Sequence, residues 1–274
     1  PGMSAMLHFS IKGYDMAFIA EGQGRPLLLI HGSLYDHRYW APQIEVLAAG
    51  GFRVIAPSLR HYWPNDSSGA AQLSIEEHIE DMVAFIAGLQ LGPIDLLGHS
   101  RGGYIVFRIA ERHPELLRRL VLAEPAGVLG EGFIAPGEAA PNYTALIADA
   151  VAKVAKGDIE AGLISFYDYA LGQGAWAKLG EPRQSICRDN ARSLIGQGQE
   201  GRIPYTRAAA EALRPRTLLL DGAVTEAPFR RVADGLAESI PAVTRLTLPN
   251  ATHLLNWDDA AGFNAAVLAF LRAP

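Results

Sequence analysis

Short runs of hydrophobic residues alternate along the chain with longer segments in which apolar and polar positions recur at helical spacing. The short runs are almost wholly apolar, which is typical of strands that are covered on both faces of a sheet. Such runs occupy 27–30, 53–56, 94–97, 120–123 and 217–220. The helix-like segments occupy 42–49, 74–89, 104–112, 227–238 and 258–271. This alternation predicts an α/β fold, with a mostly parallel, doubly wound sheet and helices on both of its faces.

Two further patterns add detail to the predicted sheet. The short runs 7–11 and 16–20 lie close together in the chain, which predicts a hairpin at one edge of the sheet. Ser74 and Glu77 stand three residues apart at the start of the helical segment 74–89. This is the spacing of a capping box, in which the serine hydroxyl accepts a free N–H of the first helical turn.

The alternation of strands and helices stops between residues 127 and 205. Helical stretches at 143–156, 159–171 and 185–194 follow one another there, and no run has the character of a strand. A helical insertion between two strands of an α/β sheet usually lies over the carboxyl edge of the strands, where ligands bind. We therefore expect residues 3–126 and 206–274 to form the core and residues 127–205 to form a helical cap.

Composition narrows the class of protein further. The chain has 274 residues, of which 49% are hydrophobic and 19% charged, so it can bury a full core. Its net charge is −5 and it has no basic block, which argues against a nucleic-acid partner. Cys187 is the one cysteine, which excludes a disulfide framework and sites built from several thiolates. We see neither a secretory signal nor a stretch of about 20 apolar residues, and so expect a cytoplasmic protein without a membrane partner.

The strongest chemical signal is the sequence Gly98-His-Ser100-Arg-Gly102. It follows the strand at 94–97 and precedes a helical stretch, which is the context that a nucleophile elbow requires. Small residues flank the serine because the turn is tight and the helix passes close to the strand. The pattern predicts that Ser100 is a nucleophile with its hydroxyl held in a cleft, whereas an ordinary glycine-rich turn is the alternative.

A serine nucleophile needs a base, and His253 is the best placed of the eight histidines. It follows a predicted strand at 243–248 and precedes the last helix, so its loop opens at the same sheet edge as Ser100. His31 and His99 lie within the turns after their strands, where a structural role is expected. Chain order therefore favours His253 as the general base.

The turn after the first core strand supplies a candidate oxyanion hole. His31-Gly-Ser33 follows the strand at 27–30, and a backbone N–H in this turn can point into the cleft beside the nucleophile. We expect the second donor to be the N–H of Arg101, directly after the nucleophile. For the first donor we favour Ser33, with Leu34 as the alternative one residue later.

Together these motifs resemble those of the α/β-hydrolase-fold proteins, and the resemblance covers nearly the whole chain. The family includes esterases, lipases, lactonases, thioesterases, carbon–carbon bond hydrolases, epoxide hydrolases and dehalogenases. The last two typically use an aspartate nucleophile, so Ser100 argues against both. Most members carry a catalytic aspartate in a Gly-x-x-Asp turn, but the corresponding turn here reads Gly222-Ala-Val-Thr225. Thr225 cannot act as a carboxylate.

Three nearby acidic residues are candidates for the missing carboxylate. Glu124 ends the strand at 120–123, where some members of the family carry their acid, and its carboxylate would need a partner such as imidazole. Glu226 follows Thr225 directly, and Asp221 precedes the turn. Glu226 could swing in from its position, but we favour Glu124 over Glu226 and place Asp221 third. The strand end directs Glu124 toward the same cleft as Ser100 and His253, and the longer glutamate side chain helps it to reach them.

The remaining motifs carry less functional weight. The segment 196–201 matches the dinucleotide pattern G-x-G-x-x-G but follows a helical stretch instead of a strand, so it predicts no cofactor site. The aromatic segments 60–63 and 166–169 and the residue Trp176 are candidates for pocket walls or simply for packing. No metal-binding or P-loop pattern is present.

The sequence therefore predicts a hydrolase without a cofactor that cleaves a carboxylic ester or a related acyl bond of a small molecule. Hydrolysis of a carbon–carbon bond or a lactone, or lyase chemistry, by the same three residues is one alternative. Faster turnover of a dicarbonyl compound than of an activated ester would favour it. A protein that binds a small molecule without turnover is the other alternative, and the departure at Thr225 is the feature that favours it.

Overall fold

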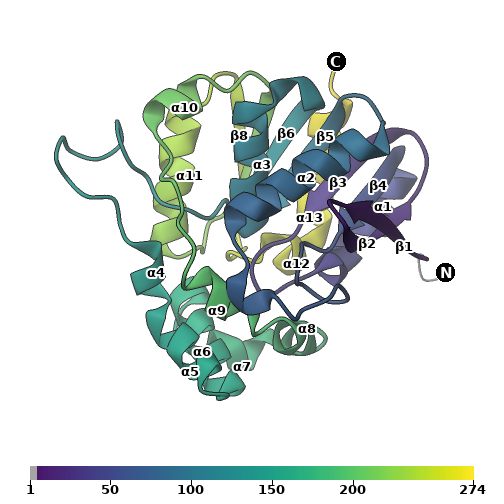
Figure 1. Ribbon diagram of the computed structural model, residues 1–274. Coiled ribbons are helices and arrows are strands. Elements are labelled where there is room, and N and C mark those ends of the chain that lie inside the picture. The colour runs from purple at the N-terminus through teal and green to yellow at the C-terminus, as the bar shows by residue number, and fades with distance from the viewer. Residues whose placement is uncertain (1–4) are drawn as a thin grey trace.

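The apolar runs of the sequence become the strands of one eight-stranded sheet, as the computed structural model of residues 5–274 shows (Figure 1). The strands pair in the order β1-β2-β4-β3-β5-β6-β7-β8. Only β1 and β2 run antiparallel to their neighbours, and the other strands are parallel. The predicted α/β class, the parallel sheet and the edge hairpin are confirmed. The expected start of the core at residue 3 lies outside the described residues. The strand bounds are Met6–Ile11, Tyr14–Glu21, Arg25–Ile30, Phe52–Pro57, Ile94–His99, Leu117–Ala123, Arg216–Gly222 and Val243–Leu248, for β1 to β8.

Helices cover both faces of the sheet because successive residues of each strand point to opposite sides. Leu27 and Leu29 of β3 belong to one hydrophobic core and Leu28 and Ile30 to the other. The first core is closed by α1 (Ala41–Ala49), α12 (Leu255–Asp258) and α13 (Ala260–Arg272). The second is closed by α2 (Ile75–Leu89), α3 (Arg101–Arg112) and α11 (Ala227–Ser239). No helix within residues 5–274 is long and apolar enough to cross a membrane.

Two helix boundaries differ from the sequence prediction for local reasons. The predicted helix 104–112 begins at Arg101, directly after the strained turn at Ser100. The predicted helix 258–271 begins instead at Ala260, as α13, because Asp259 adopts a non-helical backbone and its carboxylate caps α13 by accepting the N–H of Gly262. Side chains of this type compete with the helical backbone for N–H groups and so favour such breaks. The short helix α12 that precedes Asp259 was not predicted.

A group of short helices follows β6 and gathers at one end of the sheet (Figure 1). We call this group, α4 to α9, the helical insertion. As predicted, residues 127–205 contain helices and no strand, and every one of them is described. The predicted helix 143–156 is interrupted at Ile147, which separates α4 from α5. The predicted helix 185–194 is replaced by the two helices α8 and α9, and α7 was not predicted. The bounds are Tyr143–Leu146, Ala148–Ala155, Ile159–Leu171, Ala175–Leu179, Arg183–Asp189 and Ser193–Gln197 for α4 to α9, and α10 (Arg207–Glu211) follows them.

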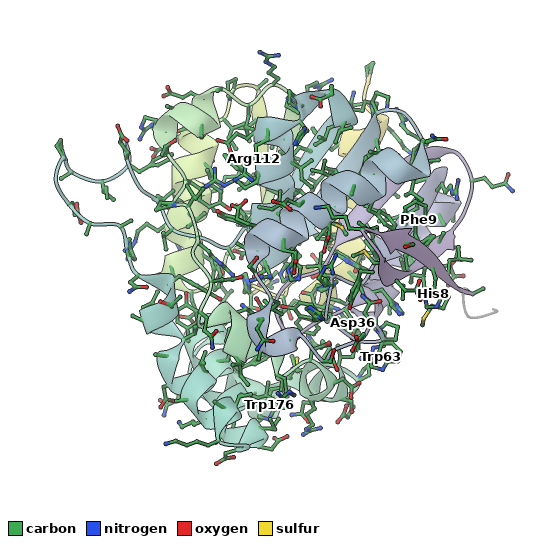
Figure 2. All side chains as sticks on the ribbon, viewed as in Figure 1. His8, Phe9, Asp36, Trp63, Arg112 and Trp176 are labelled. Atoms are coloured by element: carbon green, nitrogen blue, oxygen red, sulfur yellow. The ribbon has the colours of Figure 1, made fainter. Side chains whose placement is uncertain are left out.

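Asn190 ties the helical insertion to the loops at the carboxyl ends of the strands. Its amide nitrogen donates to the carboxylate of Asp36 (2.8 Å), and its side-chain oxygen accepts the backbone N–H of Trp63 (2.8 Å). Figure 2 shows Asp36 and Trp63 beside the insertion, with Trp176 farther out within it. Because Asn190 is buried, these hydrogen bonds hold the helical insertion in position over the carboxyl edge of the sheet.

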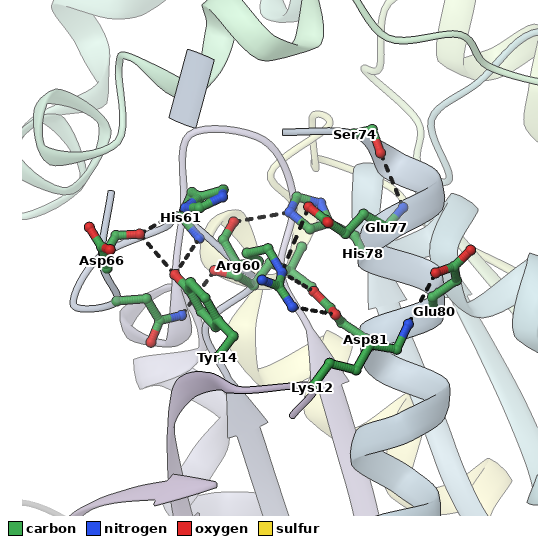
Figure 3. A network of polar contacts seen from close by, with 12 residues as sticks. Lys12, Tyr14, Arg60, His61, Asp66, Ser74, Glu77, His78, Glu80 and Asp81 are labelled. Carbon is green, nitrogen blue, oxygen red and sulfur yellow. Dashed lines mark hydrogen bonds and ion pairs between the residues drawn. The ribbon is translucent and has the colours of Figure 1, made fainter. Parts of the chain in front are cut away.

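The aromatic loop at 60–63 is packed and lies outside the pocket described below. Arg60 makes a bidentate ion pair with Asp81 of α2 (2.8 and 2.9 Å), and its carbonyl oxygen accepts a hydrogen bond from His78 (3.0 Å) (Figure 3). Ser74 caps the same helix as predicted, since its hydroxyl accepts the N–H of Glu77 at 3.2 Å (Figure 3). The loop at 60–63 therefore packs against α2 and does not line the pocket.

Candidate active site

Three strand ends bring Ser100, His253 and Glu124 together at the carboxyl edge of the sheet. Ser100 follows β5, Glu124 follows β6, and His253 lies in the loop between β8 and α12. The Oγ of Ser100 lies 2.9 Å from Nε2 of His253, which is hydrogen-bond distance. Nδ1 of the same ring lies 3.7 Å from Oε2 of Glu124. His253 thus lies between the other two side chains, close to Ser100 through one ring nitrogen and to Glu124 through the other.

The backbone at Ser100 is strained, and the surrounding glycines make that conformation feasible. Ser100 has φ of 55° and ψ of −115°, a region that non-glycine residues rarely adopt. A Cβ on Gly98 would overlap the carbonyl oxygen of Gly102, and one on Gly102 would overlap that of Ile30. The N–H of Ser100 donates to Ala123 at the end of β6 (3.0 Å), which holds the turn in place. The expected nucleophile-elbow geometry follows from these contacts.

His253 is held as a neutral, buried imidazole. Phe229 of α11 stacks on its ring, with the ring centroids 3.7 Å apart. His99 donates from Nε2 to the backbone carbonyl of His253 (2.7 Å) and itself stacks on Tyr39, so it has the structural role expected of it. Burial lowers the pKa of His253 to about 3, so the ring stays unprotonated, and able to accept a proton, down to acidic pH.

Glu124 is fully buried behind the histidine. Its backbone has φ of 46°, which turns the chain at the end of β6. One carboxylate oxygen accepts the N–H of Gly222 (3.1 Å), and the other faces His253. Burial raises the pKa of Glu124 to about 8. Among the described residues, neither Oε2 of Glu124 nor Nδ1 of His253 has a hydrogen-bond partner, and the two atoms lie 3.7 Å apart.

The two other acidic candidates point elsewhere. Glu226 directs its carboxylate toward the loop after α6, since a Cβ on Gly172 would lie 2.9 Å from its Oε1. Asp221 is bound by Arg245 (2.5 Å) and by the hydroxyl of Thr247 (2.6 Å). Thr225 is buried, and its hydroxyl lowers the pKa of Glu124. The position where the family usually has its aspartate therefore lies beside Glu124, the favoured candidate for the acid.

The candidate oxyanion residues flank Ser100. A Cβ on Gly32 would lie 3.0 Å from the Cβ of Ser100, so the turn after β3 passes directly over the nucleophile. Ser33 lines the same pocket as Ser100, whereas the alternative, Leu34, is buried and absent from the pocket lining. Arg101 begins α3, where backbone N–H groups have no partner within the helix.

A pocket of about 30 Å³ opens at Ser100 between the sheet edge and the helical insertion. Aromatic and apolar side chains make up most of its wall, and among the described residues its ionisable members are His99, His253 and tyrosines, with no acidic residue, Lys or Arg. The aromatic segment 166–169 contributes as anticipated, but Trp176 lies outside the pocket. The lining comprises Ser33, Tyr35, His99, Ser100, Ala126, Tyr143, Phe166, Tyr167, Tyr169, Ala170, Leu171, Phe229, His253 and Leu254.

Sequence reasoning missed several of these wall residues. Tyr35, Tyr143 and Phe229 come from three separate segments and carry no motif. A weak signal exists for Phe229, which lies in the first turn of the helix after the unusual turn at Thr225. Within residues 5–274 no cluster of His, Cys, Asp and Glu has the arrangement of a metal site.

Comparison with known proteins identifies the family of the chain. A family model described as alpha/beta hydrolase fold matches residues 25–260. Over 110 residues the chain is 38% identical to 2-hydroxymuconate semialdehyde hydrolase from a Pseudomonas species, a match that covers 39% of each chain. Over 260 residues it is 24% identical to (E)-2-((N-methylformamido)methylene)succinate hydrolase from Acinetobacter baylyi, covering 93% of each.

A solved structure shows the same architecture. The enol-lactonase from Burkholderia xenovorans superposes with a TM-score of 0.80 at 18% identity, covering 97% of this chain and 100% of that one. The residues that match the family model run from the start of β3 to the start of the last helix, through all the parallel strands of the sheet. The chain therefore belongs to the alpha/beta hydrolase fold family.

Proposed function

We propose that this hydrolase is a carboxylesterase-like serine hydrolase that cleaves a carboxylic ester, or a related acyl bond, of a small neutral molecule. The observation that carries the proposal is the 2.9 Å contact between Oγ of Ser100 and Nε2 of His253. A serine hydroxyl is a weak nucleophile unless an adjacent base removes its proton. The strained turn at Ser100 and the pocket that opens beside it support the same assignment.

In the first half of the reaction, Oγ of Ser100 attacks the ester carbonyl carbon while its proton passes to Nε2 of His253. The carbonyl oxygen becomes an oxyanion, which the backbone N–H groups of Ser33 and Arg101 stabilise. The bond to the alcohol oxygen then breaks, and the protonated histidine returns its proton to that oxygen. An alcohol leaves and an acyl-enzyme remains.

In the second half, His253 takes a proton from water, whose oxygen attacks the acyl carbon. Collapse of this intermediate breaks the bond to Ser100, which regains its proton, and releases the carboxylic acid. Glu124 assists both halves in its ionised form, because a carboxylate near Nδ1 orients the imidazole and stabilises its protonated form. Since burial raises the pKa of Glu124 to about 8, this form becomes more abundant as the pH rises through 8. The distance of 3.7 Å in the resting site supports this role, with the contact shortening once the ring is charged.

The pocket chemistry supports a neutral substrate. No Lys or Arg belongs to its wall among the described residues, so a carboxylate of the substrate would lose its water without gaining a cation. The named substrate of the Acinetobacter relative is a succinate derivative, which carries such groups. We assign the helical insertion within residues 127–205 the role of a cap over the core formed by 3–126 and 206–274.

Hydrolysis of a carbon–carbon bond beside a carbonyl group is a second candidate function. The 38% identity to a semialdehyde hydrolase over 110 residues favours it, and the same three side chains would perform it. The two candidate functions predict different preferred substrates. The ester proposal predicts faster turnover of 4-nitrophenyl acetate than of a dicarbonyl compound, and the reverse ranking supports the second candidate.

Steady-state hydrolysis of 4-nitrophenyl acetate tests the assignment directly. We expect Ser100→Ala to lose about 10⁴-fold or more in kcat, because the residual rate comes only from binding and the oxyanion hole. Ser67→Ala is the matched control, since Ser67 is exposed and far along the chain from the pocket residues. Full turnover by Ser100→Ala would reject the proposal.

A further inference from the structure

The glycine-rich segment at 196–201 lies where the helical insertion returns to the core. Its small residues allow close packing: a Cβ on Gly196 would lie 2.6 Å from the carbonyl oxygen of Ala70, and one on Gly198 would lie 2.8 Å from the side chain of Val151. Two long polar side chains of the same segment, Gln197 and Glu200, are buried. Both point to residues beside the nucleophile.

Gln197 holds the residue that carries one expected oxyanion donor. Its Nε2 donates to Oγ of Ser33 (2.9 Å) and to the hydroxyl of Tyr143 (3.2 Å), which lines the pocket. Its Oε1 accepts a hydrogen bond from the hydroxyl of Tyr62 (3.5 Å). The side chain is fully buried, so its amide has one fixed orientation.

Glu200 holds the residue that carries the other expected donor. Its two oxygens accept from the guanidinium of Arg101 at 2.6 and 2.8 Å, and both side chains are completely buried. Nε of Arg101 lies 3.3 Å from Nδ1 of His78, whose other ring nitrogen donates to the carbonyl of Arg60 (Figure 3). Arg101 therefore has no freedom to change rotamer without breaking a buried ion pair.

We propose that Gln197 and Glu200 are positioning residues that together set the geometry of the oxyanion hole. These two residues of one segment fix the side chains of Ser33 and Arg101, and so the directions of their backbone N–H groups. The inference rests on the proposed function, in which these two N–H groups stabilise the transition state. Because the segment ends the helical insertion, a shift of the insertion changes both donors at once.

A merely structural role makes a different prediction. Buried hydrogen bonds and ion pairs that only stabilise the fold change the melting temperature when they are removed, and leave the turnover number of the folded enzyme unchanged. A positioning role acts on the transition state, because misplacing a donor by about 1 Å costs on the order of 100-fold in rate. It therefore lowers kcat while KM stays nearly constant.

The first test replaces Gln197 by methionine, which has a similar length but no amide. We expect kcat for 4-nitrophenyl acetate to fall about 10- to 100-fold, with KM changed less than about twofold. The rate at which a fluorophosphonate modifies Ser100 should fall by a similar factor, since its phosphoryl oxygen occupies the same hole. Gln199→Met is the matched control, because Gln199 lies in the same segment and is exposed.

A double-mutant cycle of Gln197→Met with Ser33→Ala tests whether Gln197 acts on kcat through Ser33. Ser33→Ala removes the hydroxyl that Gln197 binds but keeps the backbone N–H. If Gln197 acts through Ser33, the double variant should be no slower than the slower single variant. Multiplying losses would show that Gln197 acts elsewhere, and this would overturn the assignment.

Glu200→Gln supplies an independent arm, since it keeps the shape of the side chain and removes the charge that Arg101 faces. We expect a folded variant to show the same split between kcat and KM. If Glu200→Gln does not fold, Glu200 has a structural role and the inference is overturned for that residue. The double-mutant cycle then decides the inference for Gln197. Unchanged kcat in Gln197→Met, with Ser100→Ala inactive, overturns the inference alone. Retained turnover in Ser100→Ala would instead remove the proposed function on which it rests.

Discussion

At the scale of single residues, the acid that we propose, Glu124, departs from the usual arrangement of the family. The usual aspartate position holds Thr225, and in the proposed site the carboxylate comes instead from the end of the neighbouring strand β6. A glutamate is one methylene longer than an aspartate, which helps it to reach the imidazole from that position. Its Oε2 lies 3.7 Å from Nδ1 of His253, whereas Glu226 points to the loop after α6.

Replacing the two glutamates separately tests which one supports His253. At pH 9, where Glu124 is ionised, we expect Glu124→Gln to lower kcat for 4-nitrophenyl acetate by about 10²–10⁴-fold, because a neutral amide cannot stabilise the imidazolium. Glu226→Gln is the matched control and should stay within about twofold of the unaltered enzyme. A larger loss in Glu226→Gln than in Glu124→Gln would move the acid to the other position.

The same carboxylate should make stability depend on pH. Its pKa is about 8 in the folded protein against an ordinary value of 4.5, so folding favours the protonated form. This contribution is complete below about pH 4.5 and is lost as the pH rises through 8. Glu124→Gln stays neutral, so it should match the unaltered protein near pH 5 and exceed its free energy of unfolding by about 1–3 kcal/mol at pH 9.

Urea denaturation at pH 5, 7 and 9 measures this difference, with Glu226→Gln as the control. A gap between Glu124→Gln and the unaltered protein that stays constant across these pH values would contradict the assigned environment of Glu124. His253 has the opposite sign, since burial lowers its pKa and its contribution is lost as the pH falls below its ordinary value of 6.5. The titration of His253 therefore does not affect the comparison of Glu124→Gln with the unaltered protein above pH 7.

At the scale of elements, the turn between β5 and α3 makes the chemistry possible through close backbone contact. Gly102 lies against the carbonyl oxygens of Ile30 and His31, so that β3, β5 and α3 meet at the nucleophile. Backbone atoms cannot move aside as a flexible side chain can. The strain at Ser100 persists because these neighbouring elements hold it.

Gly102→Ala should therefore destabilise the whole fold. We expect it to lose about 2–4 kcal/mol of unfolding free energy, because the new methyl group overlaps backbone atoms of β3. Gly201→Ala is the control, since a Cβ there meets nothing within 4 Å, and its effect should stay within about 0.5 kcal/mol. Equal stability of the two variants in urea would show that the elbow tolerates a side chain.

The same elements show what sequence reasoning can and cannot reach. The strands, the elbow at Ser100 and the loop of His253 were predictable because each depends on a local pattern of apolar, small or turn-forming residues. The break of the predicted helix at Ile147 and the short helix α12 before Asp259 were not, because each depends on the backbone conformation of a single residue and not on a periodic pattern. Tyr35, Phe229 and Gln197 reach the site only through contacts between distant segments, which no local pattern encodes.

At the scale of the whole molecule, the helical insertion and the sheet edge together decide what reaches Ser100. Tyr143, Phe166 and Tyr169 of the insertion face Phe229 and His253 of the core across the small pocket. The wall is mostly apolar, so it favours an acyl group without charge. The specificity of the enzyme thus depends on both parts of the chain.

A pair of esters of similar length tests this dependence on charge. We expect kcat/KM for 4-nitrophenyl hydrogen succinate to be at least about tenfold lower than for 4-nitrophenyl butyrate, because burying its carboxylate costs free energy that no cation in the wall repays. The butyrate controls for the size of the acyl group. Equal or faster hydrolysis of the succinate ester would show that a cation reaches the bound substrate.

The most direct test of the central claim is covalent labelling of the nucleophile. The protein is exposed to a fluorophosphonate, its intact mass is measured, and the modified peptide is mapped. The account predicts rapid formation of a single adduct on Ser100, absent from Ser100→Ala, because His253 lies within hydrogen-bond distance of that hydroxyl. No adduct under conditions that label an ordinary serine esterase, or an adduct on another residue, would contradict the account.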